Sequence, residues 1–257
     1  MTSRAMRTAV TISCFIAFGA GGTLLSALFF PLLGLLPGSR RRKHERARTV
    51  VGFFFRLLIR VLEKTGCMRL ETSGLDRLDN ASGALILANH PSYIDVVALI
   101  SVIPHANCVV KGDLWRNPFY WSIVRAAGYI NNTSPEAVIE SCAKVLEAKE
   151  PLILFPEGTR TPPGQAPRFQ RGAARVALQA NATVVPVLIT CEPRTLAKGD
   201  RWWLAPERPF TFRIEVREPV PTIFFMPAAE NSAISARRFT EALQQYFSRE
   251  LNEHGYA

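Results

Sequence analysis

Short apolar runs alternate with longer amphipathic stretches along most of this chain. The short runs predict strands at residues 84–87, 107–111, 128–130, 152–155, 183–190 and 210–216. The longer stretches predict helices at residues 96–100, 114–127, 134–149, 172–180 and 234–251. Because strands alternate with helices, the pattern predicts an α/β fold, a single domain with a mixed sheet flanked by helices.

Two details refine this expectation. Pro186 lies inside the run 183–190, and proline has no N–H to donate, so we expect that strand at a sheet edge or at a bulge. Residues 71–74 read Glu-Thr-Ser-Gly and predict a linker. The α/β domain is then expected to span residues 66–257, preceded by a membrane-associated segment at residues 1–65.

That N-terminal segment contains 29 consecutive residues without a charge, from 8 to 36. A helix needs roughly 20 apolar residues to span a bilayer. Residues 19–22 read Gly-Ala-Gly-Gly and interrupt the run, which has basic residues on both sides. Its length favours a spanning helix, and its glycines favour a re-entrant hairpin in one leaflet. A cleaved signal peptide fits less well, because the run is too long.

Residues 50–62 follow with a mostly apolar composition and with Arg56 and Arg60 one turn apart. This pattern predicts an amphipathic helix that lies at a membrane surface or packs on the α/β domain.

The net charge of +10 is concentrated in one place. Six basic residues and one glutamate fall within residues 40–48, so half of the net charge lies in nine residues. A nucleic-acid-binding protein is expected to have a broader basic surface. The positive-inside rule keeps this run cytoplasmic, where it would suit anionic lipid headgroups; a solvated topogenic signal explains it equally well.

Cysteine and histidine spacing gives no sign of a disulfide framework or a metal site. The five cysteines are scattered, without a Cys-x-x-Cys pair, which suits a reducing cytosol. The histidines also lack ligand-like spacing, so we expect no metal: His44, His90, His105 and His254.

A histidine and an aspartate follow the predicted strand 84–87. In one regular helix, His90 and Asp95 would point about 140° apart. They can face each other if His90 lies in the turn before the helix, and Pro91 favours this because proline suits the first helical position. Asp95 would then bond one imidazole nitrogen and leave the other free as a base. A buried core histidine at a helix start explains the pair equally well.

A second stretch repeats this plan: the short apolar run at residues 152–155 leads into a polar turn at residues 156–161. In this order, the two stretches resemble the glycerolipid acyltransferase family, whose type member is 1-acylglycerol-3-phosphate acyltransferase. Residues 89–95 match its Asn-His-x4-Asp block, and residues 155–160 match its Phe-Pro-Glu-Gly-Thr-Arg block. Its Val-Pro-Val block stands at residues 185–187, and the resemblance covers roughly residues 70–220.

The resemblance implies that an acyl group moves from a thioester, acyl-CoA or acyl carrier protein, to the hydroxyl of a lysophosphatidate-like lipid. His90 is the implied general base and Asp95 its orienting partner, and neither a protein nucleophile nor a cofactor is needed. Arg160 offers a planar fork that suits phosphate. Candidate substrate-binding residues are Asn89, Ser92, Lys111, Glu157, Gly158, Thr159, Arg160, Arg168 and Arg171. A solvated loop explains Arg168 and Arg171 equally well.

One block departs from the family pattern. Relatives usually carry a Gly-x-Ile block that ends in Asp-Arg, whereas residues 128–133 read Gly-Tyr-Ile-Asn-Asn-Thr. Either Arg160, Arg168 and Lys111 hold the acceptor phosphate, or the acceptor is not lysophosphatidate. The block at 126–131 and the Leu-Ala-Lys-Gly run are similar to acyltransferases that accompany bacterial aryl-polyene pigment pathways.

Other functions stay open at this point. The acceptor can instead be a polyene-bearing or amino-acid lipid. A catalytically silent lipid-binding protein and an acyl hydrolase are the alternatives from other classes. The resemblance implies membrane lipids and the acyl donor as partners, and a bacterial-type inner membrane with the α/β domain facing the cytoplasm.

Overall fold

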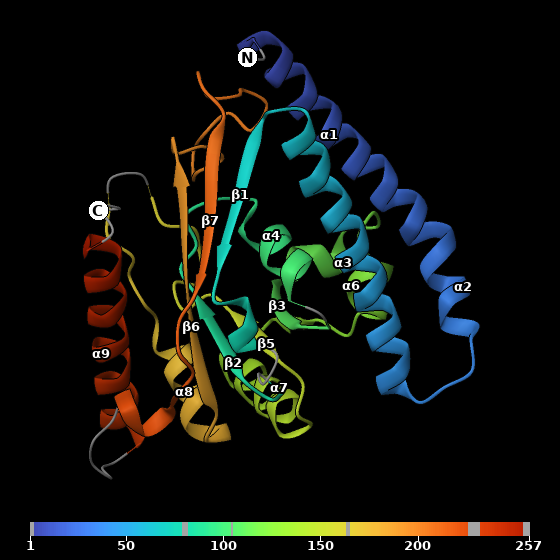
Figure 1. Cartoon of the computed structure of the whole chain (residues 1–257). Helices are drawn as coiled ribbons and strands as arrows, with labels where there is room; N and C mark the ends of the chain where they lie inside the picture. The colour runs from blue at the N-terminus through green and yellow to red at the C-terminus, as the bar shows by residue number, and fades with distance from the viewer. Residues whose placement is uncertain (1–2, 79–81, 104, 163–164, 226–231, 254–257) are drawn as a thin grey trace.

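The computed structural model describes residues 3–78, 82–103, 105–162, 165–225 and 232–253. Within them the sheet runs in the order β1-β7-β6-β2-β5-β3-β4, with β8 beside β6 (Figure 1). The strands are β1 (Met68–Ser73), β2 (Leu85–Ala88), β3 (Asn107–Lys111), β4 (Ile130–Asn132), β5 (Leu152–Leu154), β6 (Thr183–Glu192), β7 (Phe210–Val216) and β8 (Val220–Pro221). The β6–β7 and β6–β8 pairs are antiparallel and the others parallel, which confirms a mixed sheet.

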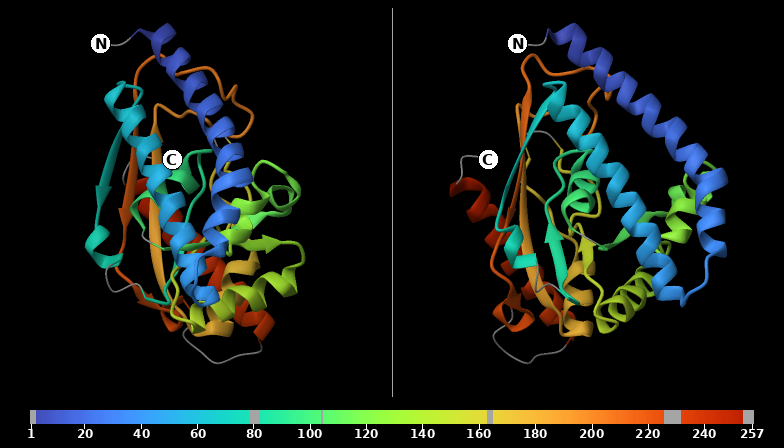
Figure 2. Two further views of the ribbon diagram at one scale, coloured as in Figure 1. Left: turned by 90° about the vertical axis from the view of Figure 1, so that its right-hand side faces the viewer. Right: turned by 45° about the vertical axis from the view of Figure 1, so that its right-hand side comes forward.

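Helices cover both faces of the sheet, so its central strands are apolar on both sides. In β2, Ile86 and Ala88 face one core and Leu85 and Leu87 the other, all with zero exposure. One face packs against α3 (Arg40–Lys64), α4 (Asp95–Val102) and α6 (Trp121–Ala126). The other packs against α7 (Pro135–Glu147), α8 (Arg171–Ala180) and α9 (Ser232–Glu253) (Figures 1 and 2).

The N-terminal segment forms one long helical run that folds back on α3. It consists of α1 (Arg4–Leu24), a π-helical turn at Leu25–Phe29 and α2 (Phe30–Leu35). The run passes through residues 19–22 without a break, so the interruption predicted at these glycines does not occur. The chain reverses after Leu35 and returns along α3 (Figure 2).

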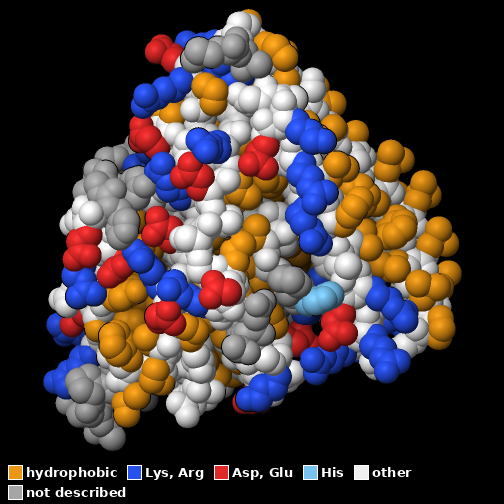
Figure 3. All heavy atoms as spheres, viewed as in Figure 1, with side chains coloured by type: hydrophobic (Ala, Val, Ile, Leu, Met, Phe, Trp, Pro, Cys, Tyr) orange, Lys and Arg blue, Asp and Glu red, His pale blue; other side chains and the backbone are white. Residues whose placement is uncertain are grey.

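This run exposes most of its apolar surface. Residues 4–35 are long and apolar enough to cross a membrane, with a mean hydropathy of 1.8. Large apolar side chains are exposed along it and form the broad hydrophobic area at the right of Figure 3, among them Ile16, Leu24, Leu28, Leu32 and Leu35. Such an area on a protein surface marks an interaction site.

Two expectations about elements were wrong. Residues 71–73 belong to β1 instead of a linker; β1 is an edge strand, which tolerates the polar composition that suggested a loop. The helix predicted at 114–127 is two helices, α5 (Gly112–Arg116) and α6, because Pro118 disfavours helical geometry at Asn117.

For Pro186 the expected edge position is not found but the expected bulge is: Pro186 lies in β6, inside the sheet between β2 and β7, where the pairing shifts by one residue between Val184–Val220 and Val187–Val216. The carbonyl of Pro186 accepts a hydrogen bond from the Arg217 N–H at 2.9 Å. The nitrogen of Pro186 therefore faces the gap between the β6–β8 pairing and the β6–β7 pairing, where no hydrogen-bond donor is needed.

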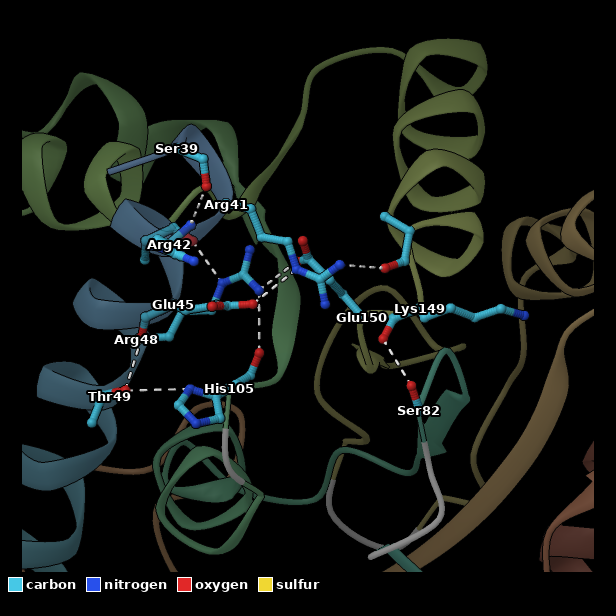
Figure 4. Close-up of polar contacts among 12 residues, drawn as sticks. Ser39, Arg41, Arg42, Glu45, Arg48, Thr49, Ser82, His105, Lys149 and Glu150 are labelled. Atoms are coloured by element: carbon cyan, nitrogen blue, oxygen red, sulfur yellow. Dashed lines mark hydrogen bonds and ion pairs between the residues drawn. The ribbon is translucent and has the colours of Figure 1, made fainter. Parts of the chain in front are cut away.

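The basic run at residues 40–48 forms the start of α3, and one of its members is buried. The Arg48 guanidinium pairs with Glu150 at 2.6 Å and donates to the carbonyl of Ala127 at 2.7 Å and that of His105 at 3.2 Å (Figure 4). Its side chain is only 2% exposed. The predicted contact with lipid headgroups is therefore wrong for Arg48, which fastens α3 to the α/β domain.

Candidate active site

His90 and Asp95 meet at the carboxyl end of β2. His90 lies in the turn after β2, and Asp95 is the first residue of α4. The imidazole Nδ1 lies 2.7 Å from Asp95 Oδ2, which also accepts the Ser92 N–H at 2.8 Å. The imidazole stacks on the Phe155 ring with 4.3 Å between centroids. With Nδ1 engaged, Nε2 is the nitrogen available to a substrate in the adjacent cavity.

Asp95 is completely buried, with only part of its charge compensated. Burial raises the pKa of Asp95, while the hydrogen bonds from His90 and Ser92 and the charge of Arg160 oppose that rise. Within the described chain, Oδ1 has no hydrogen-bond partner. The carboxylate is therefore held by its contacts with the His90 turn.

Glu157 connects the second sequence block to the first. Its Oε1 accepts the backbone N–H of His90 at 2.8 Å, and its Oε2 accepts the Thr161 hydroxyl at 2.6 Å. The Thr161 N–H donates in turn to the His90 carbonyl at 2.8 Å. Burial raises the pKa of Glu157, and the Thr161 and His90 hydrogen bonds counter it. Both oxygens are thus occupied in fixing the turn that carries His90.

Asn89 and Ser92 have similar positioning contacts. The Asn89 amide exchanges two hydrogen bonds with the backbone of Ile189, at 2.7 and 2.8 Å. The Ser92 hydroxyl donates to the Thr195 carbonyl at 3.1 Å. Asn89, Ser92 and Glu157 are buried and do not line the cavity, so the substrate contacts predicted for them are corrected to positioning contacts.

Gly158, Thr159 and Arg160 do line the cavity. Gly158 adopts φ +66, a left-handed conformation that favours glycine at this sharp turn. The Arg160 guanidinium lies 3.4 Å above the Tyr93 ring and donates to the Ala197 carbonyl at 3.0 Å. Among the described residues no carboxylate pairs with Arg160, so its charge is available to an anion.

The remaining predicted cations separate into two groups. Lys111, at the end of β3, and Arg171, at the start of α8, line the cavity, whereas Arg168 does not. Sequence reasoning missed Arg175 and Arg237, which also line it. Arg175 was detectable, because it stands four residues after Arg171 in a predicted helix and so shares its face.

The cavity next to His90 has a volume of about 1750 Å³. Apolar side chains from four helices line most of it, including Phe18, Leu58, Val97 and Ile123. Asn132 lines it beside Lys111, its partner in the β3–β4 pairing. The site thus combines a histidine held by a carboxylate with a large cavity that cations and many apolar side chains line. Among the described residues, no group of three or more metal-ligating side chains occurs; His254 lies outside them.

Comparison with known proteins agrees with this arrangement. The profile of the acyltransferase family matches residues 69–190. A 1-acyl-sn-glycerol-3-phosphate acyltransferase of Pseudomonas aeruginosa is 27% identical over 183 residues, 69% of each chain. One from Cocos nucifera is 31% identical over 114 residues, 42% of this chain but only 37% of that protein.

A solved structure extends the likeness to the whole fold. The crystal structure of the 1-acyl-sn-glycerophosphate acyltransferase from Thermotoga maritima superposes with a TM-score of 0.73 at 17% identity. The match covers 99% of this chain and 97% of that one, N-terminal helices included. Residues 69–190 thus carry the profile of the acyltransferase family, and the curated relatives and the shared fold make this chain similar to acyltransferases of that family.

Proposed function

We propose that this chain moves a fatty acyl group from an acyl thioester to the hydroxyl of a lysophosphatidate-like lipid at a membrane. The observation that carries the proposal is the 2.7 Å contact between His90 and Asp95 beside the large apolar cavity. A histidine held by a carboxylate is suited to general-base chemistry, and an apolar compartment beside it suits an acyl chain.

The reaction needs a base, an orienting group and correct placement of two substrates. His90 Nε2 takes the proton of the acceptor hydroxyl, whose oxygen then attacks the thioester carbonyl carbon. The carbon–sulfur bond breaks, and the imidazolium returns the proton to the leaving thiolate. Asp95 keeps Nδ1 protonated and stabilises the imidazolium, and Glu157 holds the backbone of the histidine turn.

The apolar part of the cavity would hold the acyl chain. Residues from α1, α3, α4 and α6 surround it, so the N-terminal helices complete its wall. Arg160 and Lys111 line the same cavity and would bind the acceptor headgroup. No arginine stands in residues 128–133, and amides take its place, which favours a second candidate: the same chemistry on a different lipid acceptor.

Membrane attachment would use the N-terminal helices. One face of the helix at residues 4–35 contacts the α/β domain along its length: Arg7 donates to Pro206, the Ser26 hydroxyl lies 2.7 Å from that of Ser122, and Phe30 is buried. A helix fixed in this way suits a position in the plane of the membrane surface better than a crossing. We place this surface at a bacterial-type inner membrane, with the α/β domain on its cytoplasmic side.

Product analysis tests the proposal. The purified chain in vesicles receives an acyl donor, lysophosphatidate and a crude lipid extract as competing acceptors, and mass spectrometry follows all products. New phosphatidate supports the ordinary phospholipid role, and acylation of another lipid supports the second candidate. Free fatty acid without an acceptor identifies a hydrolase, and no new product identifies a silent lipid-binding protein; either outcome refutes the proposal.

The same assay tests the acyl compartment with donors of different chain length. Val97→Phe adds volume to the α4 wall of the cavity and is expected to shift the preference toward shorter chains. Val102→Phe, on the same helix but away from the cavity, is the matched control. An equal preference in both variants would contradict this placement of the chain.

A further inference from the structure

The cavity that contains His90 also reaches a second group of charges, on α8 and α9. Arg171 and Arg175 of α8 and Arg237 of α9 line it there; we call these three residues the arginine face. Arg171 and Arg175 are exposed and stand four residues apart, so they project from the same side of α8. Arg237 is paired with Glu241 at 2.8 Å.

The charge of this region is unbalanced. The cations along the whole cavity are Lys111, Arg160, Arg171, Arg175 and Arg237, and the carboxylates are Asp113 and Glu241. Among the described residues no carboxylate pairs with Arg171 or Arg175, and no acidic residue occupies the first turn of α8. The positive end of the helix dipole therefore adds to these two charges.

The arginine face lies away from the apolar surface. Helices α8 and α9 cover one face of the sheet, while α3, with α1 and α2 outside it, covers the other (Figures 1 and 2). The exposed apolar side chains of residues 16–35 belong to the latter side. A membrane bound there leaves the arginine face open to the aqueous phase, where it is accessible to a soluble partner.

We propose that the arginine face docks an acidic carrier protein that delivers the acyl thioester. This inference rests on the proposed function and names its donor. Arg171 and Arg175 present two unpaired positive charges one turn apart on the exposed side of α8, and Arg237 of α9, which is paired with Glu241, lines the same cavity. Complementary charge of this kind speeds association and fixes orientation. Because the same cavity joins this face to His90, a thioester on the carrier's prosthetic arm has a route to the base.

The test compares two donors with the same acyl chain, acyl carrier protein and acyl-CoA, at low ionic strength. Arg175→Glu is expected to lower kcat/KM with the carrier protein by about tenfold or more, and added salt should shrink that loss. With acyl-CoA the loss should stay below about threefold, because a small donor does not cover the exposed face. Arg69→Glu is the control: it makes the same charge change on β1, where the Arg69 side chain is 77% exposed. It should change kcat/KM with neither donor.

A binding measurement separates failure of this inference from failure of the proposed function. Fluorescence anisotropy of a labelled acyl carrier protein is expected to show weaker binding to Arg175→Glu than to the wild type and to Arg69→Glu. Equal losses of kcat/KM with acyl carrier protein and with acyl-CoA would overturn the inference, because they would indicate that the arginine face binds a phosphate group that both donors carry. Unchanged binding in Arg175→Glu would overturn it as well. Charge-sensitive binding without transfer from either donor would uphold the docking face and refute the proposed function.

Discussion

The Glu157 carboxylate accepts a hydrogen bond from the backbone N–H of His90 at 2.8 Å, although the two residues stand 67 positions apart in the chain. Through this bond the turn after β5 holds the turn after β2, and Thr161 closes the same network from the other side. The two sequence blocks therefore form one structural unit, in which the second block positions the histidine of the first.

This contact predicts how Glu157 tolerates substitution. Glu157→Ala leaves the His90 N–H and the Thr161 hydroxyl without their acceptor, so we expect the free energy of unfolding to fall by about 1–3 kcal/mol and activity to fall at least tenfold. Glu157→Gln keeps an acceptor for His90 and should retain most of both. Thermal unfolding and initial rates measure the two effects. A loss of activity in Glu157→Gln as large as in Glu157→Ala would instead indicate that the negative charge acts on the substrate.

Asp95 is expected to favour function at the expense of stability. Asp95→Asn should lower kcat/KM by about 100-fold or more, because the imidazole loses the charge that stabilises its protonated form. Its effect on stability depends on pH. Burial raises the folded pKa of Asp95 above its unfolded value, so the folded protein binds more protons.

The wild type should therefore gain stability relative to Asp95→Asn as the pH falls through the folded pKa, and lose it as the pH rises. Denaturant unfolding of both proteins across this pH range measures the difference. A relative gain of the wild type with rising pH would contradict the assigned direction.

Arg48 tests how α3 is attached to the α/β domain, independently of catalysis. Arg48→Ala leaves Glu150 unpaired at a nearly buried position, and we expect a loss of about 3 kcal/mol in the free energy of unfolding. Arg42→Ala removes an exposed charge from the same basic run and should change it by no more than about 0.5 kcal/mol. Chemical denaturation measures both. Equal effects of the two substitutions on the free energy of unfolding would mean that the basic run at residues 40–48 contributes to stability only through its overall charge.

The exposed apolar surface of α2 is expected to bind membranes. Leu32→Ser combined with Leu35→Ser removes two side chains that are 64% and 79% exposed, so vesicle binding should weaken in a flotation assay while the fold is kept. Ile223→Ser is the matched control, because Ile223 is 68% exposed and lies near α9, on the other side of the molecule. Equal binding by both variants would rule out α2 as the contact surface.

Local patterns were sufficient for the central strands and for the histidine turn. Residues 84–87 and 152–155 are apolar on both faces because helices cover both sides of the sheet, and such runs are recognisable in sequence. The His90–Asp95 contact followed from five-residue spacing with His90 in the turn ahead of the helix, which is a local constraint. Pro91 does not occupy the first helical position, because α4 begins at Asp95. The likeness to acyltransferases rested on the same stretches.

Features that depend on distant partners were not predictable. Glu157 looked like a substrate ligand because nothing local indicates that His90 would occupy one oxygen and Thr161 the other. Arg48 looked like its basic neighbours because its partner, Glu150, is 102 residues away. Pro186 indicated an edge position or a bulge, and only the assembled sheet determines that it lies inside the sheet, at the one-residue shift between the β8 and β7 ladders.

The most direct test of the account is the rate of acyl transfer by His90→Ala. With equal amounts of folded protein, a thioester donor and lysophosphatidate or the lipid identified as acceptor, we expect this variant to be slower than the wild type by about 100- to 10,000-fold, because it lacks the general base. Circular dichroism confirms that the fold is kept. A rate within about threefold of the wild type would contradict the assignment of His90 as the base and, with it, the proposed mechanism.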